Sequence, residues 1–215
     1  MATLITAYSW PAALERERSV TWQPQWGNNY SPPTIDKTIQ VSNTDGGGLW
    51  LATFANVTVW SRAQVLAWQE MEVLLMGGLE PVNLPMLLCN QEPTPTSGAI
   101  EIRTVGATAA RATTIVVNLV NSGALVAGMH FSYNFTAALL GHRMFRIKTV
   151  AAVIGQPTQR SLTIWPPLRA AIADAQELRF RLPLCVMKLA APDVMKLDLD
   201  LRRRGAPSAN FIEAN

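Results

Sequence analysis

Residues 49–75 read LWLATFANVTVWSRAQVLAWQEMEVLL and predict a long strand followed directly by a helix. The first part of this stretch, Leu49–Trp60, is rich in β-branched and aromatic residues and apolar on both faces. Such a strand lies in the middle of a sheet, or between its own core and a neighbouring subunit. Ser61 and Gln64 then have the spacing of a helix capping box. Apolar residues recur at helical intervals until Gly77-Gly78, so we expect one helix of about 16 residues packed across a sheet.

The residues before this stretch predict a first strand, a loop and a hairpin. Leu14–Thr21 has the texture of a strand, and Trp22–Pro33 has the Gly, Asn and Pro content of a loop. Thr38–Asn43 alternates, and Asp45-Gly46 follows, so we expect this run to pair with Leu49–Trp60 as a hairpin. The loop carries three aromatic residues that either face a partner or pack on the chain's own core: Trp22, Trp26 and Tyr30.

After the helix, Pro81–Leu88 predicts a short strand near a sheet edge, and Glu92–Gly98 predicts a boundary rich in Pro, Thr and Ser. Short β runs with turn-like breaks follow, which is the pattern of a small β-barrel or sandwich. The runs are Ala99–Val105, Thr113–Leu119, His130–Phe135, Met144–Val150, Ser161–Trp165 and Glu177–Arg181. We therefore expect a module at 93–181 inserted into a domain made of 1–92 and 182–215. Its two necks would bring Leu88-Cys89 close to Leu184-Cys185, because the ends of an inserted unit lie close together.

The C-terminal segment Lys196–Arg202 alternates between aliphatic and charged residues, as a half-buried strand does. Its charged residues are Lys196, Asp198, Asp200 and Arg202, and they face either solvent or a water-filled channel. Arg204-Gly205 then turns the chain, and Pro207–Ile212 can pair back as a final strand.

Composition narrows the function classes. Only 15% of the 215 residues are charged, and seven are Trp, which indicates a large core or surfaces covered by partners. The net charge of +3 comes with no long basic stripe, so nucleic-acid recognition is not indicated. The cluster Arg202–Arg204 is either a solvated turn or a contact with a subunit or passing DNA. We expect no signal peptide, no membrane span and, with two Cys, no disulfide scaffold.

No arrangement of residues indicates catalysis. His130 and His142 lack accompanying metal ligands, and the charges flanking Asp198 and Asp200 favour ordinary ion pairs. The Gly46–Gly48 triplet lacks the Lys-Ser/Thr ending of a phosphate-binding loop. We therefore expect no catalytic, cofactor or metal site, and a protein that is not an enzyme.

The order of these parts resembles the distal tail or tail-hub proteins of long-tailed bacteriophages and gene transfer particles. The resemblance rests on the Ser31-Pro32-Pro33 loop, the Thr38–Trp60 hairpin, the Ser61-capped helix and the Pro81–Leu88 strand. It continues in Ser161–Arg169, which ends in Pro-Pro-Leu-Arg, and in the closing runs Leu197–Leu201 and Asn210–Glu213. It implies a mainly β fold with one helix: a tail-tube-like β-sandwich with a flanking α-helix and an inserted small β-barrel or sandwich.

The resemblance also implies a function in the virion tail tip, assembled in the bacterial host cytoplasm. The expected form is a homo-oligomeric ring, most simply a hexamer, with the tail tube protein above, hub, baseplate or receptor-binding proteins below, and DNA passing transiently through its lumen. Candidate subunit contacts are Trp22, Trp26, Tyr30, Leu49, Trp50, Leu51, Phe54 and Trp60. Candidate lumen residues are Lys196, Asp198, Asp200 and Arg202. The alternative is a carbohydrate-binding or receptor-recognition module with Tyr133, Phe135 and Trp165 as its aromatic platform.

Overall fold

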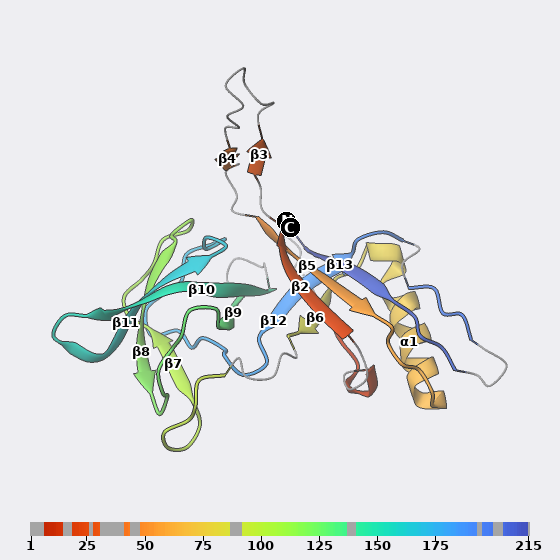
Figure 1. The fold of residues 1–215 in the computed structure, drawn as a ribbon, viewed down its shortest axis with the longest axis horizontal. Helices are drawn as coiled ribbons and strands as arrows, with labels where there is room; N and C mark the ends of the chain where they lie inside the picture. Colours follow the sequence, from red (N-terminus) through yellow and green to blue (C-terminus); the bar gives the residue numbers. More distant parts are fainter. Residues whose placement is uncertain are drawn as a thin grey trace.

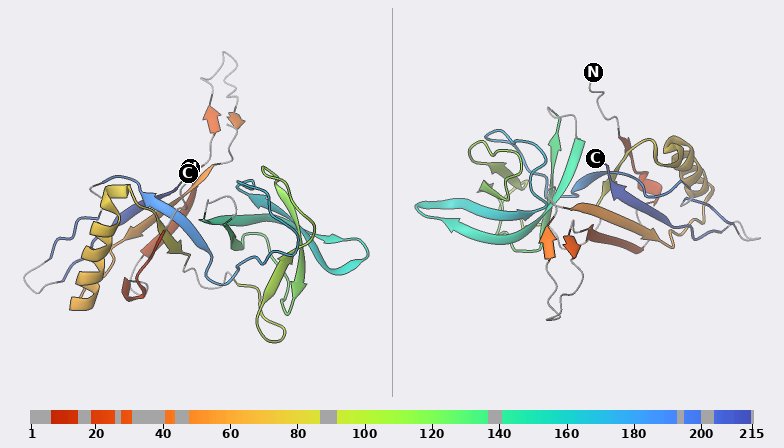
Figure 2. Two further views of the ribbon diagram at one scale, coloured as in Figure 1. Left: turned by 180° about the vertical axis from the view of Figure 1, so that it is seen from behind. Right: turned by 90° about the horizontal axis from the view of Figure 1, so that it is seen from above.

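The protein is mainly β with one α-helix, and its strands form two large sheets. The structure, a computed structural model, describes residues 7–14, 19–25, 28–30, 41–43, 48–86, 92–136, 141–192, 195–199 and 204–214, with the backbone alone for 28–30 and 41–43. The first sheet, called the large sheet here, lies at one end of the molecule with the helix. The second, called the half-barrel, lies at the other end (Figures 1 and 2).

The large sheet has six strands in the order β1-β6-β12-β13-β5-β2. Only β1 pairs in parallel, with β6, and the other neighbours are antiparallel. Its strands are β1 (Tyr8–Ser9), β2 (Ser19–Gln25), β5 (Leu49–Ala55), β6 (Val82–Pro85), β12 (Leu184–Leu189) and β13 (Ala209–Glu213). One face is apolar and contributes Trp50, Phe54 and Phe211 to a core that also contains Trp68 of the helix. Among the described residues, the other face is exposed over β2, β5 and β13, whereas Val186 of β12 on the same face is buried and lies against Gly141 of β10.

The helix α1 (Arg62–Leu74) forms where the capping box predicts it. Ser61 accepts a hydrogen bond from the Gln64 amide, and the Gln64 side chain accepts one from the Ser61 amide at 3.0 Å. Trp68 and Met71 are the buried residues of this helix. The helix is shorter than expected, because Met76–Gly78 continues as a 3₁₀ turn in which Gly77 has φ 65°. A second 3₁₀ turn, Ala12–Leu14, contacts α1.

The half-barrel is a curled sheet of five antiparallel strands in the order β7-β8-β11-β10-β9. These are β7 (Glu101–Thr104), β8 (Thr114–Val120), β9 (His130–Phe135), β10 (Gly141–Val153) and β11 (Gln156–Trp165). The segment 172–180 bridges its two outer strands: Leu178 N donates to Ile102 O of β7 at 2.8 Å, and Arg179 N donates to Ser132 O of β9 at 2.9 Å. The half-barrel encloses its own core, which includes Phe131, Phe145 and Phe180.

All the strands of the half-barrel lie in the sequence between β6 and β12, which are paired neighbours in the large sheet. The chain therefore leaves and re-enters the large sheet side by side, with Met86 N donating to Pro183 O at 2.9 Å. The predicted approach of Leu88-Cys89 to Leu184-Cys185 involves residues 87–90, which lie outside the described residues. Cys185 itself is a buried free thiol.

Three sequence-based expectations are corrected. The strand β5 pairs with β2 and β13, whereas 41–43 forms β4 (Val41–Asn43) and pairs with β3 (Asn28–Tyr30) as a ribbon that stands away from both sheets in Figure 1. The first long strand is therefore β2 at Ser19–Gln25, where we expected a loop from Trp22 onward, because Pro24 is tolerated on an edge strand. The described residues 195–199 are not a strand, and β13 pairs with β5 and β12 instead.

Candidate assembly surfaces

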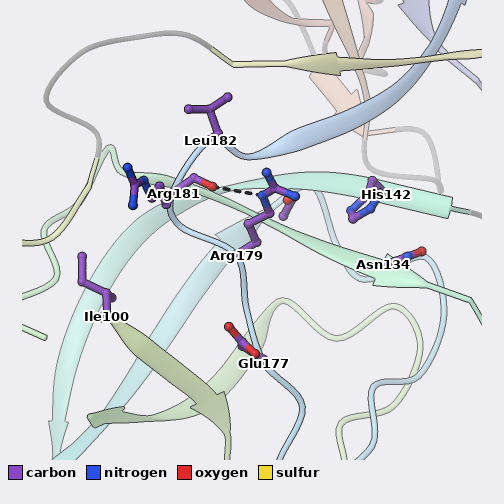
Figure 3. A pocket seen from close by; sticks show the side chains of 8 residues that line it. Ile100, Asn134, His142, Glu177, Arg179, Arg181 and Leu182 are labelled. Atoms are coloured by element: carbon purple, nitrogen blue, oxygen red, sulfur yellow. Dashed lines mark hydrogen bonds between the residues drawn. The ribbon is translucent and has the colours of Figure 1, made fainter. Parts of the chain in front are cut away.

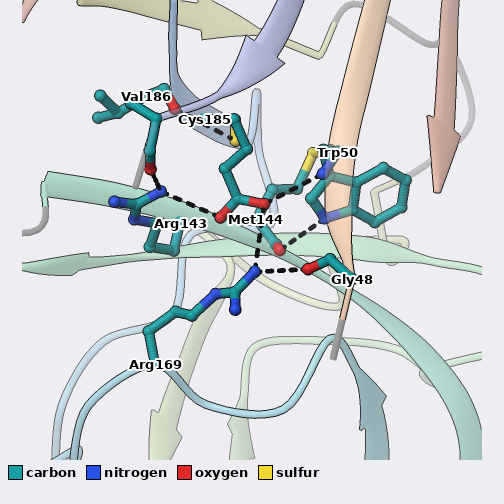
Figure 4. Close-up of polar contacts among 9 residues, drawn as sticks. Gly48, Trp50, Arg143, Met144, Arg169, Cys185 and Val186 are labelled. Carbon is teal, nitrogen blue, oxygen red and sulfur yellow. Dashed lines mark hydrogen bonds and ion pairs between the residues drawn. The ribbon is translucent and has the colours of Figure 1, made fainter. Parts of the chain in front are cut away.

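A buried ion cluster joins the large sheet to the half-barrel (Figure 4). The Glu213 carboxylate of β13 accepts hydrogen bonds at 3.1 Å from Arg143 Nη1 of β10 and from the Trp50 amide of β5. Arg169, in the loop after β11, places Nη2 3.7 Å from the same carboxylate and also donates to the Gly48 carbonyl. Trp50 completes the junction, since its indole Nε1 donates to Met144 O at 2.9 Å. These contacts fix the two sheets relative to each other.

Cys185 lies beside this cluster and is not a reactive thiol. Burial, followed by the nearby Glu213 charge, raises the pKa of the Cys185 thiol well above its ordinary value. A thiol must ionise to act as a nucleophile or a metal ligand, so this side chain serves packing.

The large sheet ends in an exposed edge strand, called the open edge here: β2, Ser19–Gln25. Trp50 of β5 donates its amide to Glu213, which is on β13, the neighbour opposite to β2. The Trp50 amide therefore points away from β2. Trp50 and Pro24 are register partners, so they form a non-hydrogen-bonded pair of the antiparallel ladder, and the backbone C=O of Pro24 points away from β5. By alternation, the N–H and C=O groups of Val20 and Trp22 also point outward. In the described part of the chain, no strand pairs with this side of β2.

The exposed part of this second face of the large sheet, over β2, β5, β13 and Lys188 of β12, is called the open face here, and its described residues are uncharged apart from that lysine. Register partners lie on the same face of a sheet, which identifies its members. They are Ser19, Thr21, Gln23, Gln25, Leu49, Leu51, Thr53, Ala55, Lys188, Asn210 and Ile212. Each is exposed or half-buried. Aliphatic, hydroxyl and amide side chains are therefore interspersed across a broad surface without a carboxylate.

The predicted contact residues divide between core and surface. Trp50 and Phe54 are fully buried in the chain's own core, which removes them as subunit contacts. Leu49 and Leu51 are half-buried on the open face, Trp22 packs its ring partly on the core from β2, and Trp60 is 61% exposed. Trp26 lies outside the described residues, and for Tyr30 only the backbone in β3 is described.

The predicted lumen strand does not form among the residues described. Lys196 and Asp198 are highly exposed and make a 3.5 Å ion pair with each other, which contributes little in water. Asp200 and Arg202 lie outside the described residues. The polar surface that does lie on a sheet is the open face, which was not predicted from the sequence. The sequence does contain a pattern that indicates its strand β2, because polar residues alternate at Ser19, Thr21, Gln23 and Gln25. Pro24 and the nearby Gly and Asn residues led us to expect a loop there instead.

Around α1, exposed apolar side chains form a second surface, called the helix face here. It comprises Leu66, Val73, Met76 and Leu79, each more than half exposed. Leu66 and Val73 are seven positions apart and so lie on the same side of the helix. Clustered exposed apolar residues on a helix mark a contact with another protein or a membrane.

The aromatic platform of the carbohydrate-binding alternative is not formed. Phe135 is buried in the half-barrel core, and Trp165 is buried against Trp50 in the other core, with ring centroids 5.0 Å apart. Tyr133 is half-buried and packs edge-on against Phe135. Two of the three rings are therefore enclosed in separate cores, so the three cannot form one platform for sugar stacking.

Both histidines lie on the half-barrel and are held neutral at pH 7. Burial, then the Arg146 charge, lowers the pKa of His130 to about 4. Burial, then the Arg179 charge, lowers the pKa of His142. Within the described ranges, His, Cys, Asp and Glu nowhere gather in a group that could hold a metal ion. No helix among the residues placed by the structure combines the length and apolarity needed to cross a membrane.

No model of a known protein family matches this chain, and no curated protein matches it significantly in sequence.

Proposed function

We propose that this chain is a virion structural protein whose copies form a closed ring at the distal end of a phage tail. The ring would join the tail tube to the hub or baseplate and leave a lumen for DNA. The observation that carries this proposal is the open edge, a seven-residue strand whose outward backbone groups have no strand partner in the described chain.

An open edge of this length is a template for pairing with another chain. The two outermost strands of the large sheet are β2 and β1. Head-to-tail contact between β2 of one copy and the β1 side of the next uses both edges in every copy, and such a contact closes into a ring when its rotation divides a circle. Trp22 supports a contact here, since its enclosed indole Nε1 has no hydrogen-bond partner among the described residues. A neighbouring copy can supply the missing acceptor.

The open face fits the wall of a channel for DNA. Proteins hold DNA mainly through Lys and Arg contacts to phosphates. The open face offers only Lys188 for such contacts and has no carboxylate that would repel phosphates. A wall of Ser, Thr, Gln and Asn side chains would let the polyanion pass without being bound or excluded.

The β3–β4 ribbon and the helix face are the proposed contacts with the tail proteins stacked above and below the ring. The β3–β4 ribbon stands away from both sheets (Figure 1), and the helix face is apolar. A ring that is stacked between other tail proteins needs contacts of this kind in addition to those between its own copies. The tail tube protein above and a hub, baseplate or receptor-binding protein below are the partners proposed for them.

Two substitutions of one residue test the edge contact. Val20→Pro removes an outward N–H that a neighbouring copy would use, and Val20→Ala shortens the side chain to a similar degree but keeps that N–H. Sedimentation velocity of both variants, after circular dichroism has confirmed their folding, should show smaller assemblies for Val20→Pro only. Equal assembly of the two variants would remove the open edge as the ring contact.

A further inference from the structure

A polar pocket of about 560 Å³ lies on the outside of the half-barrel, beside the neck that leads back to the large sheet (Figure 3). Asn134 of β9 and His142 of β10 are register partners and form one wall. The opposite wall comes from Glu177 and Arg179 of the segment that bridges the half-barrel, and from Arg181 directly after it. Ile100 and Leu182 add apolar surface. The pocket can therefore contact the hydrocarbon part of a ligand on one side and hydrogen-bond its oxygen atoms on the other.

The charged groups of the pocket are not neutralised within the described chain. Neither Arg179 nor Arg181 makes an ion pair with a described residue, although Glu177 lines the same pocket. Arg179 uses only Nε, which donates to the Arg181 carbonyl at 3.0 Å, so both of its terminal Nη groups are free for a ligand. With two guanidinium groups and one carboxylate, the pocket carries a net positive charge.

The neutral side chain of His142 is also available for binding. The Nδ1 atom of His142 is enclosed and has no hydrogen-bond partner among the described residues. An enclosed polar atom normally finds a protein or ligand partner.

We propose that this pocket binds a small hydroxylated anion, namely a sugar unit that carries a carboxylate or a phosphate. The guanidinium groups of Arg179 and Arg181 bind the anionic group, because Arg presents paired donors that match carboxylate and phosphate oxygens. Glu177, Asn134 and His142 bind the hydroxyl groups, and Ile100 and Leu182 contact the carbon face of the ring. The site would give the tail tip a contact with acidic surface glycans and does not depend on ring formation.

The backbone conformation of Leu182 indicates that the pocket wall formed by Arg179 and Arg181 is held in place. Leu182 has φ 46°, a left-handed conformation that is unfavourable for a large side chain. Such a residue persists only where the surrounding structure enforces it. Here the next strand residue, Leu184, is tied to Ser132, so the neck and the pocket wall form one fixed unit.

Isothermal titration calorimetry of the full chain tests this site with three probes: trigalacturonate for the carboxylate, glucose 6-phosphate for the phosphate, and glucose as the neutral control. We expect saturable binding of at least one anionic probe, and the stronger of the two identifies the anionic group. Glucose should bind about tenfold more weakly or not at all, because the charge-assisted hydrogen bonds are lost.

Variants decide whether binding occurs in this pocket. Arg179→Gln and Arg181→Gln should each lower the affinity for the anionic probe by about tenfold or more. Lys148→Gln removes an exposed positive charge of β10 outside the pocket and should leave binding unchanged. Absence of saturable binding of both anionic probes to a folded chain would overturn the proposal, as would equal binding of glucose. An equal loss in Lys148→Gln would also overturn it, because binding would then follow overall charge.

Discussion

Replacing Glu213 by Gln should destabilise the protein strongly, because Glu213 supplies the only side-chain carboxylate that the described residues place at the junction between the sheets. The Arg143 side chain is 3% exposed and the Glu213 side chain 0% exposed. In the described chain the Arg143 guanidinium has two partners, Glu213 and the Ala214 carbonyl, and its Nε has none. Gln keeps an oxygen for the Trp50 amide but leaves Arg143 as an uncompensated buried charge. Removal of one member of a buried ion pair costs about 3–5 kcal/mol.

Urea unfolding followed by tryptophan fluorescence measures this cost. A loss of 3–5 kcal/mol is a large part of the roughly 5–15 kcal/mol that stabilises a typical domain, so the midpoint should fall markedly. Asp198→Asn is the matched control, since it neutralises the acidic partner of an exposed ion pair and should leave the midpoint nearly unchanged. If Glu213→Gln unfolded at the same urea concentration as the wild type, the cluster would not be what holds the sheets together.

Three further predictions use the same unfolding assay. Ser61→Ala should cost about 1 kcal/mol because it removes the cap of α1, and an unchanged midpoint would mean that the capping box contributes nothing to stability. Gly48→Ala should destabilise more than Gly155→Ala: both glycines have positive φ, but only at Gly48 would a β-carbon overlap its surroundings, 2.6 Å from Trp165 Cζ2. His130 has its pKa lowered from 6.5 to about 4, so the unfolded chain binds its proton first as the pH falls and stability declines from pH 6.5 to 4. His130→Gln should flatten that decline by up to about 3 kcal/mol, and parallel pH profiles for variant and wild type would contradict the assigned shift.

The local elements of this fold could be predicted from the sequence where neighbouring residues determine them. The capping box at Ser61 and Gln64 depends on residues three positions apart, and it forms as the spacing predicts. The strand His130–Phe135 also forms with the predicted bounds, because its alternation continues without a proline or glycine.

The pairing of strands could not be predicted in the same way. Asp45-Gly46 has the composition of a tight turn, which favoured a hairpin between the flanking runs. The observed partner of β5 is instead β2, from before the ribbon, and that choice depends on contacts distant in sequence. With β5 expected to pair with 38–43, neither the open edge nor the open face could be predicted. The expected lumen at Lys196–Arg202 rested separately on the alternation of aliphatic and charged residues there.

The pocket beside the neck could not be predicted from the sequence either. Asn134 and His142 come together through strand register, and Arg179 and Arg181 arrive from the segment that bridges β7 and β9. No spacing along the chain signals that arrangement.

If copies of this chain complete one another's sheets, electron microscopy of the purified 215-residue chain will show it. We predict closed rings with a central lumen, in which β2 of each copy lies against the large sheet of the next and the open face points inward. Isolated monomers at every protein concentration, or a ring in which β2 faces solvent, would contradict the claim.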